Sequence, residues 1–376
     1  MVFFSVNSIP ENKERILEIS EMTVLQRAAR QAVSLNMDGN ICRNMPDRTC
    51  KHGGENIMIL QDIGPHTLRN QYSERTEPKP DNPVFCFRGA KLLIKKNAGH
   101  SFEKEAGLAF EGGRVSMPEN GLEWKDEKQF YLERGRFLRL PEAAELEAAG
   151  SLNLTYLFTV DERPTFLLRD DLPDEKIPEG FAFMDIRTMR QAAYGPQHRL
   201  FAAITAYQLS NWYRDNRFCG TCGTPTVHSD TERALRCPSC GRLIYPRIIP
   251  AVIVGVLNGD RILLTKYAGR DFAHYALIAG FTEIGETFEE TVAREVMEEA
   301  GVRVKNIRYY KSQPWGIVDD LLAGFYCDVD GDPTIHMDKN ELKEAAWHTR
   351  DEIVLQPTDH SLTNEMMTRF KQGLEC

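Results

Sequence analysis

The amino-acid sequence predicts an α+β fold divided among several domains. Three observations support this prediction: paired apolar segments typical of β-hairpins, two closely spaced cysteine pairs, and one strongly acidic segment with helical periodicity. The length of 376 residues is that of roughly two or three domains. Hydrophobic residues make up 42% and charged residues 27% of the chain, which excludes a mostly disordered or fibrous protein.

Residues 1–56 form a segment to which we assign no chemistry. The main pattern in it is a helical stretch around residues 21–35. Two interpretations are open for this segment, a helical appendage and a disordered extension.

Residues 57–214 are expected to form a β-rich domain with a few helices. Apolar segments at residues 84–87 and 92–94 predict a hairpin, and residues 156–160 and 165–168 predict a second one. An amphipathic helix between residues 199 and 216 is predicted by apolar residues at helical spacing, namely Leu200, Ile204, Tyr207 and Trp212.

Two cysteine pairs define a module at residues 215–247. Each pair has two intervening residues and is followed by a glycine that allows a tight turn, and 14 residues separate the pairs. This spacing brings four thiolates to one tetrahedral ion and predicts one structural Zn²⁺ per chain. Four free thiols, or an iron site of the same geometry, are the alternatives. The expected zinc ligands are Cys219, Cys222, Cys237 and Cys240.

Residues 248–376 contain the signals of a second α+β domain. Asn258 and Gly259 separate two apolar segments, residues 252–257 and 262–264. This arrangement predicts a hairpin whose turn takes positive φ at both positions. A final helix is predicted by three apolar residues at helical spacing, Leu362, Met366 and Phe370.

The most informative segment is an acidic helix within this second domain. Thr287 and Glu290 form a capping box and Gly301 supplies a stop signal, which together predict a helix from Phe288 to Ala300. Its inward-facing apolar side is expected to comprise Val292, Ala293, Val296, Met297 and Ala300.

Three glutamates fall within an arc of about 100° on the other side of this helix: Glu295, Glu298 and Glu299. Carboxylates this close repel one another, and a divalent cation with oxygen ligands, Mg²⁺ or Mn²⁺, relieves the repulsion. Arg294 is placed to pair with Glu290 and Glu298, or to contact Glu286 across the preceding loop. On charge alone, a solvated acidic helix is the alternative interpretation.

The spacing of these residues is that of the Nudix box at each defined position. It runs from Gly280 through Glu286 and Arg294 to Gly301 and includes the three glutamates. The chain therefore resembles the Nudix hydrolases. The resemblance implies an α/β/α sandwich that hydrolyses a nucleoside diphosphate linked to another moiety, with the metals carried on a loop, a helix and a second loop.

Further features resemble the NADH pyrophosphatase group of this family, often called the NudC type. The cysteine module directly precedes the Nudix segment, Tyr245 and Pro246 follow the module, and residues 312–315 follow the Nudix box. The resemblance covers roughly residues 57–376. It implies a Nudix-like domain before the zinc ribbon and a catalytic Nudix domain after it. It also implies hydrolysis of the diphosphate bond of NAD(H) to NMN(H) and AMP, and removal of NAD caps from RNA.

The same resemblance implies the site residues. The ligands of the catalytic Mg²⁺ or Mn²⁺ would be Glu295, Glu299, Glu341 and the carbonyl of Ala279. Glu298 or Glu299 would accept a proton from water, with Arg294 and Glu286 completing the catalytic set. The substrate-binding residues would be Tyr245 and Phe281, whose rings hold the bases, together with Ser312, Gln313, Pro314, Trp315 and Asp320. Without the family, Tyr245, Phe281 and Trp315 would be interpreted as core aromatics.

Residues 316–320 depart from the pattern of the group, which has two prolines and a serine in this segment. Their loss loosens the loop, and Asp319 and Asp320 would repel a diphosphate unless they bind metal or turn away from it. The choice among NADH, NAD⁺ and ADP-ribose is therefore open. Two other functions are alternatives: a generalist Nudix hydrolase of ADP-ribose or dinucleoside polyphosphates, and a non-catalytic nucleotide-sensing or RNA-binding Nudix protein.

Composition bounds the partners and the compartment. The net charge of −9 means that a phosphate-bearing ligand must be held locally, by cations or by a metal. The longest apolar segment, residues 248–257, is too short to span a bilayer, and we find no secretory signal. Five scattered cysteines suit a reducing compartment. We expect a cytoplasmic protein with no membrane partner, and, because the related enzymes are homodimers, a homodimer.

Overall fold

The computed structural model describes residues 59–96, 129–147, 150–268, 274–356 and 360–375, except residues 74 and 130. Every element below belongs to residues 52–376, which form one compact unit. The helix expected around residues 21–35 lies outside the described residues. Among the helices that are described, none combines the length and the apolar character needed to cross a membrane.

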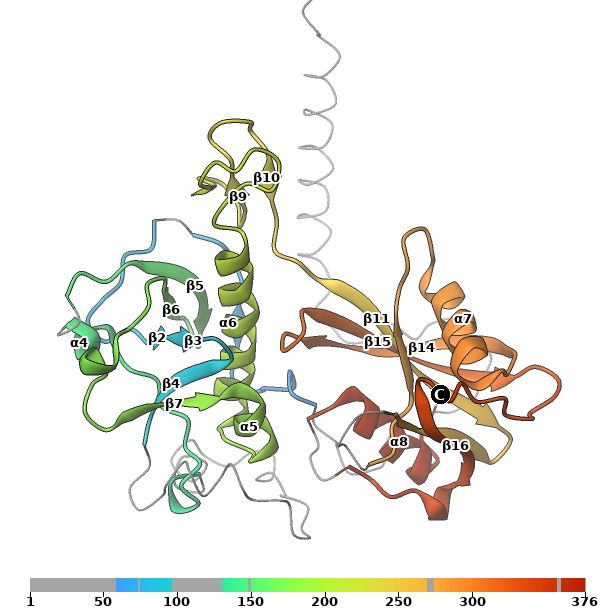
Figure 1. Ribbon diagram of the computed structural model, residues 1–376. Coiled ribbons are helices and arrows are strands. Elements are labelled where there is room, and N and C mark those ends of the chain that lie inside the picture. Colours follow the sequence, from blue (N-terminus) through green and yellow to red (C-terminus); the bar gives the residue numbers. More distant parts are fainter. Residues whose placement is uncertain are drawn as a thin grey trace, which may run out of the picture. The chain divides into compact units, whose positions relative to one another are not determined.

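Two small sheets form the first part of this unit (Figure 1). One has the strand order β1-β5-β6-β2, and the other has the order β3-β4-β7. Their bounds are β1 (Leu68–Arg69), β2 (Val84–Phe85), β3 (Phe87–Arg88), β4 (Lys91–Lys95), β5 (Leu154–Val160), β6 (Arg163–Leu168) and β7 (Phe181–Asp185). The helices described here include α4 (Ala143–Leu146), α5 (Ile186–Gln191), α6 (Gln197–Asp215) and a 3₁₀ turn, η2 (Asp174–Lys176).

One of the two hairpins expected in this part is confirmed, and the other is partly wrong. Strands β5 and β6 pair antiparallel as predicted. In the hairpin predicted for residues 84–94, β3 pairs with β4 as expected. Strand β2 is not part of that hairpin, because it runs parallel to β6 in a different sheet. Val84, Phe85 and Cys86 are all buried, because the chain passes here from one sheet to the next. A strand in a half-exposed hairpin would instead alternate between buried and exposed residues.

The predicted amphipathic helix is confirmed as α6. Its buried side chains include Leu200, Ile204 and Trp212, which join a core cluster with residues of both sheets. Tyr207 is partly buried against the same cluster. The helix therefore connects the core of this part to the cysteine module, which begins immediately after it.

The last part of the chain contains a six-stranded mixed sheet. Five strands follow the order β14-β15-β11-β12-β16, and β13 pairs with β11. Strands β11 and β15 are parallel, and the other pairs are antiparallel. The bounds are β11 (Ile249–Asn258), β12 (Arg261–Tyr267), β13 (Ile278–Phe281), β14 (Val304–Trp315), β15 (Asp320–Val329) and β16 (Leu342–Thr349), with a 3₁₀ turn, η3 (Arg350–Glu352), after β16.

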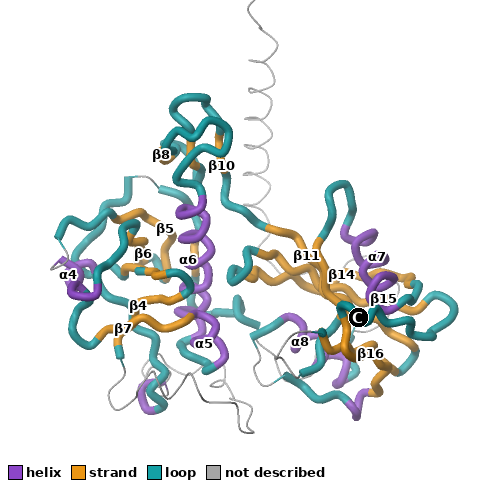
Figure 2. The backbone as a smooth tube through the Cα atoms, viewed as in Figure 1, coloured by secondary structure: helices purple, strands orange, loops and turns teal. Residues whose placement is uncertain are grey.

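Two helices, α7 (Phe288–Ala300) and α8 (Leu362–Gln372), cover opposite faces of this sheet (Figure 2). Strand β11 shows the alternation that this requires. Val252 and Val254 pack with residues of α7, and Ile253 and Leu257 pack with residues of α8. The expected α/β/α sandwich is confirmed, and so is the C-terminal helix, whose Met366 has no exposed surface.

The hairpin between β11 and β12 forms where the sequence predicts it, but its turn differs by one residue. Asn258 pairs with Arg261, so the two loop residues are Gly259 and Asp260. Gly259 has φ 64°, whereas Asn258 is not among the described residues with positive φ. The expectation of positive φ at Asn258 is wrong because its place in the ladder keeps its backbone extended.

Helix α7 has the predicted bounds, with Thr287 and Glu290 forming the capping box and Gly301 at φ 68° ending it. Its buried side is different from the one predicted. Ala293 and Met297 are exposed, and Thr291, Glu295 and Glu299 are buried beside Val292, Val296 and Ala300. The helix is rotated so that two carboxylates face inward. Hydrophobic periodicity cannot show this because it assigns charged residues to the outer face.

Candidate active site and zinc ribbon

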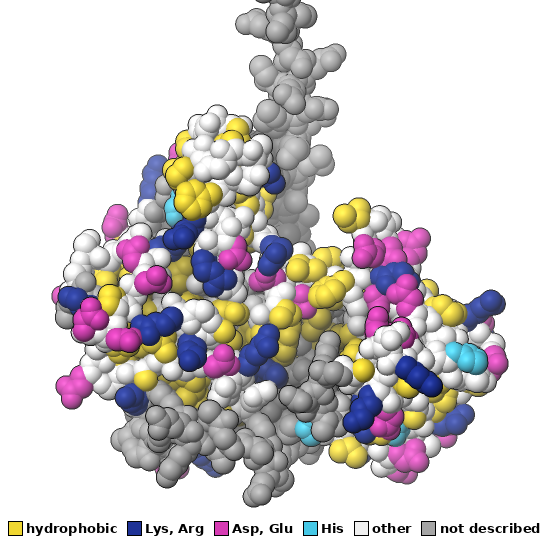
Figure 3. All heavy atoms as spheres, viewed as in Figure 1, with side chains coloured by type: hydrophobic (Ala, Val, Ile, Leu, Met, Phe, Trp, Pro, Cys, Tyr) yellow, Lys and Arg dark blue, Asp and Glu magenta, His cyan; other side chains and the backbone are white. Residues whose placement is uncertain are grey.

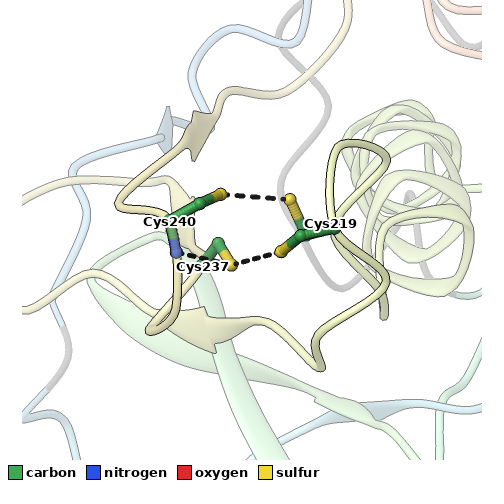
Figure 4. Close-up of side chains that lie close together, drawn as sticks. Cys219, Cys237 and Cys240 are labelled. Atoms are coloured by element: carbon green, nitrogen blue, oxygen red, sulfur yellow. Dashed lines mark hydrogen bonds between the residues drawn. The ribbon is translucent and has the colours of Figure 1, made fainter. Parts of the chain in front are cut away.

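The cysteine module is a small three-stranded sheet with two cysteine turns. Its strands, in the order β10-β9-β8, are β8 (Val227–His228), β9 (Leu235–Arg236) and β10 (Leu243–Ile244). The Sγ atoms of Cys219 and Cys240 are 3.6 Å apart (Figure 4), and those of Cys222 and Cys237 are 3.5 Å apart. Sulfurs bound to one tetrahedral Zn²⁺ lie about 3.8 Å apart. The four cysteines therefore fit a single zinc ion.

Each cysteine turn depends on the glycine that follows its pair. The backbone N–H of Gly223 donates to the carbonyl of Cys219 at 2.8 Å, and the N–H of Gly241 donates to the carbonyl of Cys237 at 3.0 Å. Both glycines take positive φ, as the sequence predicts. Hydrogen bonding with the hydroxyl of Thr224 lowers the pKa of Cys222 to about 6, which favours the thiolate form that binds metal.

We expect Cys237→Ser to remove zinc and to destabilise the protein, because the three remaining thiolates cannot complete the tetrahedral set. A destabilisation of about 3 kcal/mol would lower the melting temperature by roughly 5–10 °C. Zinc analysis and thermal unfolding measure the two effects. Ser239→Ala is the matched control, since Ser239 is exposed within the same turn. Full zinc content in Cys237→Ser would contradict the assignment.

The second site surrounds Arg294 of α7, which connects the helix to the loop before it. Its Nε lies 2.6 Å from Oε1 of Glu286. Its Nη1 lies 2.7 Å from Oε1 of Glu295 and 3.0 Å from Oε2 of Glu298. Its Nη2 donates to the carbonyl of Phe281 at 2.9 Å. The expected pairing with Glu298 and Glu286 forms, whereas Glu290 is occupied by the capping box.

Negative charge is concentrated around Glu295. Arg294 lowers the pKa of Glu286 to about 2, so that carboxylate stays ionised. Burial raises the pKa of Glu295, and the charges of Glu298 and Glu341 raise it further against the opposing effect of Arg294. Figure 3 shows acidic side chains gathered over α7 and the loop before it, with basic side chains among them. One guanidinium does not balance the charge of these carboxylates, and a divalent cation would reduce the remaining negative charge.

Gly280 on β13 allows Glu295 to lie against the strand. A Cβ atom at Gly280 would be 1.9 Å from Cδ of Glu295, far closer than two carbon atoms can approach. The carbonyl of the neighbouring Ala279 stays a predicted ligand. Buried carboxylates next to a backbone strand form the hard oxygen donor set that Mg²⁺ and Mn²⁺ prefer, so these residues fit such a cation. The four cysteine sulfurs all lie within 4.8 Å of one another. The carboxylate oxygens of Glu295, Glu299 and Glu341 do not meet this criterion.

The predicted base-holding aromatics are surface residues. Tyr245 is 54% exposed and Phe281 is 53% exposed, so neither belongs to the core. The hydroxyl of Tyr245 donates to Glu232 at 3.1 Å, which leaves its ring accessible. Trp315 is different, because it packs against the core around α6 and the guanidinium of Arg190 lies 5.1 Å from its ring centroid.

Residues 312–315 form the end of β14, and their described contacts are structural. The carbonyl of Ser312 accepts from Gln61 at 2.8 Å. Gln313 has no exposed surface, since its Nε2 donates to the carbonyl of His360 and its Oε1 accepts from the N–H of Leu362. Pro314 pairs with Leu321 of β15. Their predicted contact with substrate stays a prediction.

Of the two aspartates in the divergent segment, one is in an ion pair and the other is buried. Asp319, at φ 67°, pairs with Arg247, whose Nη2 lies 2.5 Å from its Oδ2. Asp320 is buried, and burial, followed by the charge of Asp319, raises its pKa to about 6. Gly316 packs against α6, where a Cβ would lie 2.9 Å from the carbonyl of Ile204. The loop is thus fixed by contacts with the helix, and the predicted role of Asp320 in substrate binding stays a prediction.

Comparison with protein families covers most of the chain. Residues 82–212 match the NADH pyrophosphatase-like rudimentary NUDIX domain, residues 214–245 match the NADH pyrophosphatase zinc ribbon domain, and residues 247–370 match the NUDIX domain. The NAD-capped RNA hydrolase NudC of Klebsiella pneumoniae subsp. pneumoniae is 41% identical over 183 residues, which are 49% of this chain and 71% of the relative. The chain belongs to the NADH pyrophosphatase family of Nudix hydrolases.

A second relative and a solved structure match over a shorter length. The NAD-capped RNA hydrolase NudC of Citrobacter koseri is 40% identical over 160 residues, and the match spans 43% of this chain and 62% of that relative. A crystal structure of a NUDIX hydrolase from Nitrosomonas europaea is 23% identical, covers 42% of this chain and 90% of that chain, and has a TM-score of 0.37.

Some contacts of the Nudix site carry no signal that sequence reasoning could use. The hydroxyl of Thr291 donates to Glu286 at 3.0 Å and so holds the loop carboxylate from a second side. Glu344, three residues after Glu341, accepts from Lys266 at 2.7 Å and from Tyr275 at 2.5 Å. Nothing in the sequence distinguishes Thr291 from other residues of the helix. Lys266, Tyr275 and Glu344 come from separate segments of the chain. The fold alone brings these residues together.

Proposed function

We propose that this protein hydrolyses the diphosphate bond of NAD(H), releasing NMN(H) and AMP, and that it also removes NAD caps from RNA. The observation that supports this most directly is the buried pair Glu295 and Glu299 at the position of the Nudix box, with Glu295 held by Arg294 against Gly280. The relatives named NAD-capped RNA hydrolase support the choice of substrate.

The catalytic cofactor in this proposal is Mg²⁺ or Mn²⁺. Glu295, Glu299, Glu341 and the carbonyl of Ala279 would hold it. When bound, a divalent cation would neutralise negative charge on the diphosphate and lower the pKa of a bound water molecule. Glu299 is buried, whereas the side chain of Glu298 is 59% exposed and can exchange a proton with solvent. We assign Glu299 to cation binding and Glu298 to proton transfer, with Arg294 and Glu286 fixing the loop and helix that carry them.

Two exposed rings, Tyr245 and Phe281, would hold the bases of the dinucleotide. Stacking on an aromatic ring contributes about 1–3 kcal/mol per base. Phe281→Ala is therefore expected to raise KM for NADH roughly 5- to 150-fold, with a smaller change in kcat. Steady-state kinetics measures this split. Tyr309→Ala is the control, because Tyr309 is another exposed aromatic in the same domain and has no proposed role. Equal KM values for the two variants would contradict base stacking by Phe281.

Product identification tests the proposed reaction. The full chain is incubated with NADH, NAD⁺, ADP-ribose and NAD-capped RNA, each with Mg²⁺ or Mn²⁺ and each with a chelator. Chromatography should show AMP with NMN(H) from the dinucleotides and 5′-monophosphate RNA from capped RNA. Intact substrates under all metal conditions would overturn the proposal, and faster hydrolysis of ADP-ribose than of NADH would assign a different preference.

We further propose that the chain acts as a homodimer in the cytoplasm. The four zinc-binding cysteines and the buried free thiols of Cys86 and Cys327 suit a reducing compartment. Light scattering on the purified chain would measure the oligomeric state directly, and a monomeric mass at enzyme concentrations would contradict the dimer.

A further inference from the structure

A second group of metal-ligating side chains lies in the N-terminal part of the unit, outside the zinc ribbon and the Nudix site. It consists of His66, Asp161 and His198. One ligand atom from each of the three lies within 4.8 Å of the other two. Nδ1 of His66 is 2.7 Å from Oδ2 of Asp161, and the rings of His66 and His198 are stacked with their centroids 3.6 Å apart.

The fold holds the carboxylate of this group at a tight turn. Asp161 and Glu162 are the two loop residues between β5 and β6, with φ of 48° and 65°. Positive φ at both positions is typical of a type I′ hairpin turn, and Asp tolerates this conformation better than most residues. The N–H of Thr67 donates to Oδ1 of Asp161 at 2.9 Å, and the N–H of Asp161 donates to the carbonyl of Thr67. The turn and the segment that carries His66 are therefore fixed to each other.

His198 comes to the same point from the first turn of α6. It is buried, and its neighbour Gln197 donates from Nε2 to the carbonyl of Ile59 at 2.7 Å and to that of Asp62 at 3.2 Å. These bonds tie the beginning of α6 to the segment that leads to His66. Three separate parts of the chain thus present their ligand atoms to one small volume.

We propose that His66, Asp161 and His198 bind a second zinc ion, distinct from the ion of the ribbon. Two imidazoles and a carboxylate are ligands that zinc takes together, with water in a fourth position. The side chain of Asp161 is 47% exposed, so water and metal can reach the group. Ligands of a tetrahedral zinc lie about 3.4 Å apart, so the 2.7 Å contact between His66 and Asp161 opens as the ion enters.

An ion held here would cross-link the β5–β6 turn, the segment before β1 and the start of α6. Its effect would be to stabilise this domain.

Metal content of the full chain tests the proposal. After dialysis against metal-free buffer, the unchanged protein should retain two zinc ions per chain, and Asp161→Asn should retain one. Asn also tolerates positive φ and keeps the oxygen that accepts from Thr67, so the turn is preserved. Glu162→Gln is the matched control in the same turn and should retain two ions. His66→Gln should retain one and provides a second variant if Asp161→Asn folds poorly by circular dichroism.

Cobalt substitution separates the two sites. The absorption of cobalt bound to thiolate reports the ribbon alone, and it should be equal in the unchanged protein and in Asp161→Asn, while cobalt content falls from two ions to one. A single zinc in the unchanged protein, or two in both Asp161→Asn and His66→Gln, would overturn the proposal. A fall in the thiolate absorption of Asp161→Asn that matches its fall in metal content would also overturn the proposal, because the missing ion would then be the ion of the ribbon.

Discussion

Glu299→Gln is expected to lower kcat for NADH by at least about a hundredfold, which corresponds to roughly 2.7 kcal/mol of transition-state stabilisation. Glu299 is only 1% exposed and lies on the inward side of α7 with Glu295. Glutamine keeps the size of the side chain and removes the charge that a divalent cation requires. We expect the melting temperature to change little, because the substitution removes a buried charge without creating a cavity.

Steady-state kinetics with Mg²⁺ and with Mn²⁺ measures this effect. Two further glutamine variants of the same helix serve as comparisons. Glu289→Gln changes an exposed glutamate in the first turn and should leave the rate near normal. Glu298→Gln should also lower kcat, but without raising the metal concentration needed for half-maximal activity. A near-normal rate for Glu299→Gln would refute its role in catalysis.

Gly280→Ala should also be strongly damaging, although it adds a single methyl group. The added Cβ would lie 1.9 Å from Cδ of Glu295 and 2.1 Å from its Oε1, so the carboxylate must move. The strand cannot yield easily, because Gly280 is paired with Val252 of β11. A displacement of about 1 Å in a catalytic group costs about a hundredfold in rate. We expect a loss of this size in kcat and a higher metal requirement.

The control for this prediction is a glycine that has space for a side chain. Gly220→Ala places its Cβ more than 4 Å from any surrounding atom and should leave kinetics and metal requirement unchanged. Normal activity in Gly280→Ala would show that the carboxylate of Glu295 is not needed at its observed position. Thermal unfolding of both variants separates a local displacement from a loss of folding.

The parts of the structure that sequence predicts well are those fixed by neighbours along the chain. Helix α7 begins at a capping box and ends at a glycine, and both signals lie within a few residues of the ends they determine. The cysteine turns are fixed by the glycines that follow them. Hairpin β5–β6 is likewise a local structure.

The parts that sequence predicts poorly depend on contacts between distant segments. The passage of the chain from β2 in one sheet to β3 in the other is decided by which strand each one meets. Met297 is exposed because of the way α7 is rotated against β13. The hydrophobic periodicity of α7 does not determine that rotation. His66, Asp161 and His198 likewise come from three elements and form no motif in the chain.

The alternation of side chains along β13 would separate two proposed tasks of the site. Ile278 packs on the α7 side and Ala279 on the α8 side, and Gly280 lies against the carboxylate of Glu295. By the same alternation, the side chain of Phe281 is expected on the face opposite Gly280. If the proposed function holds, cation binding and base recognition lie on different faces of one strand, and replacing Phe281 would change substrate preference without moving the carboxylates.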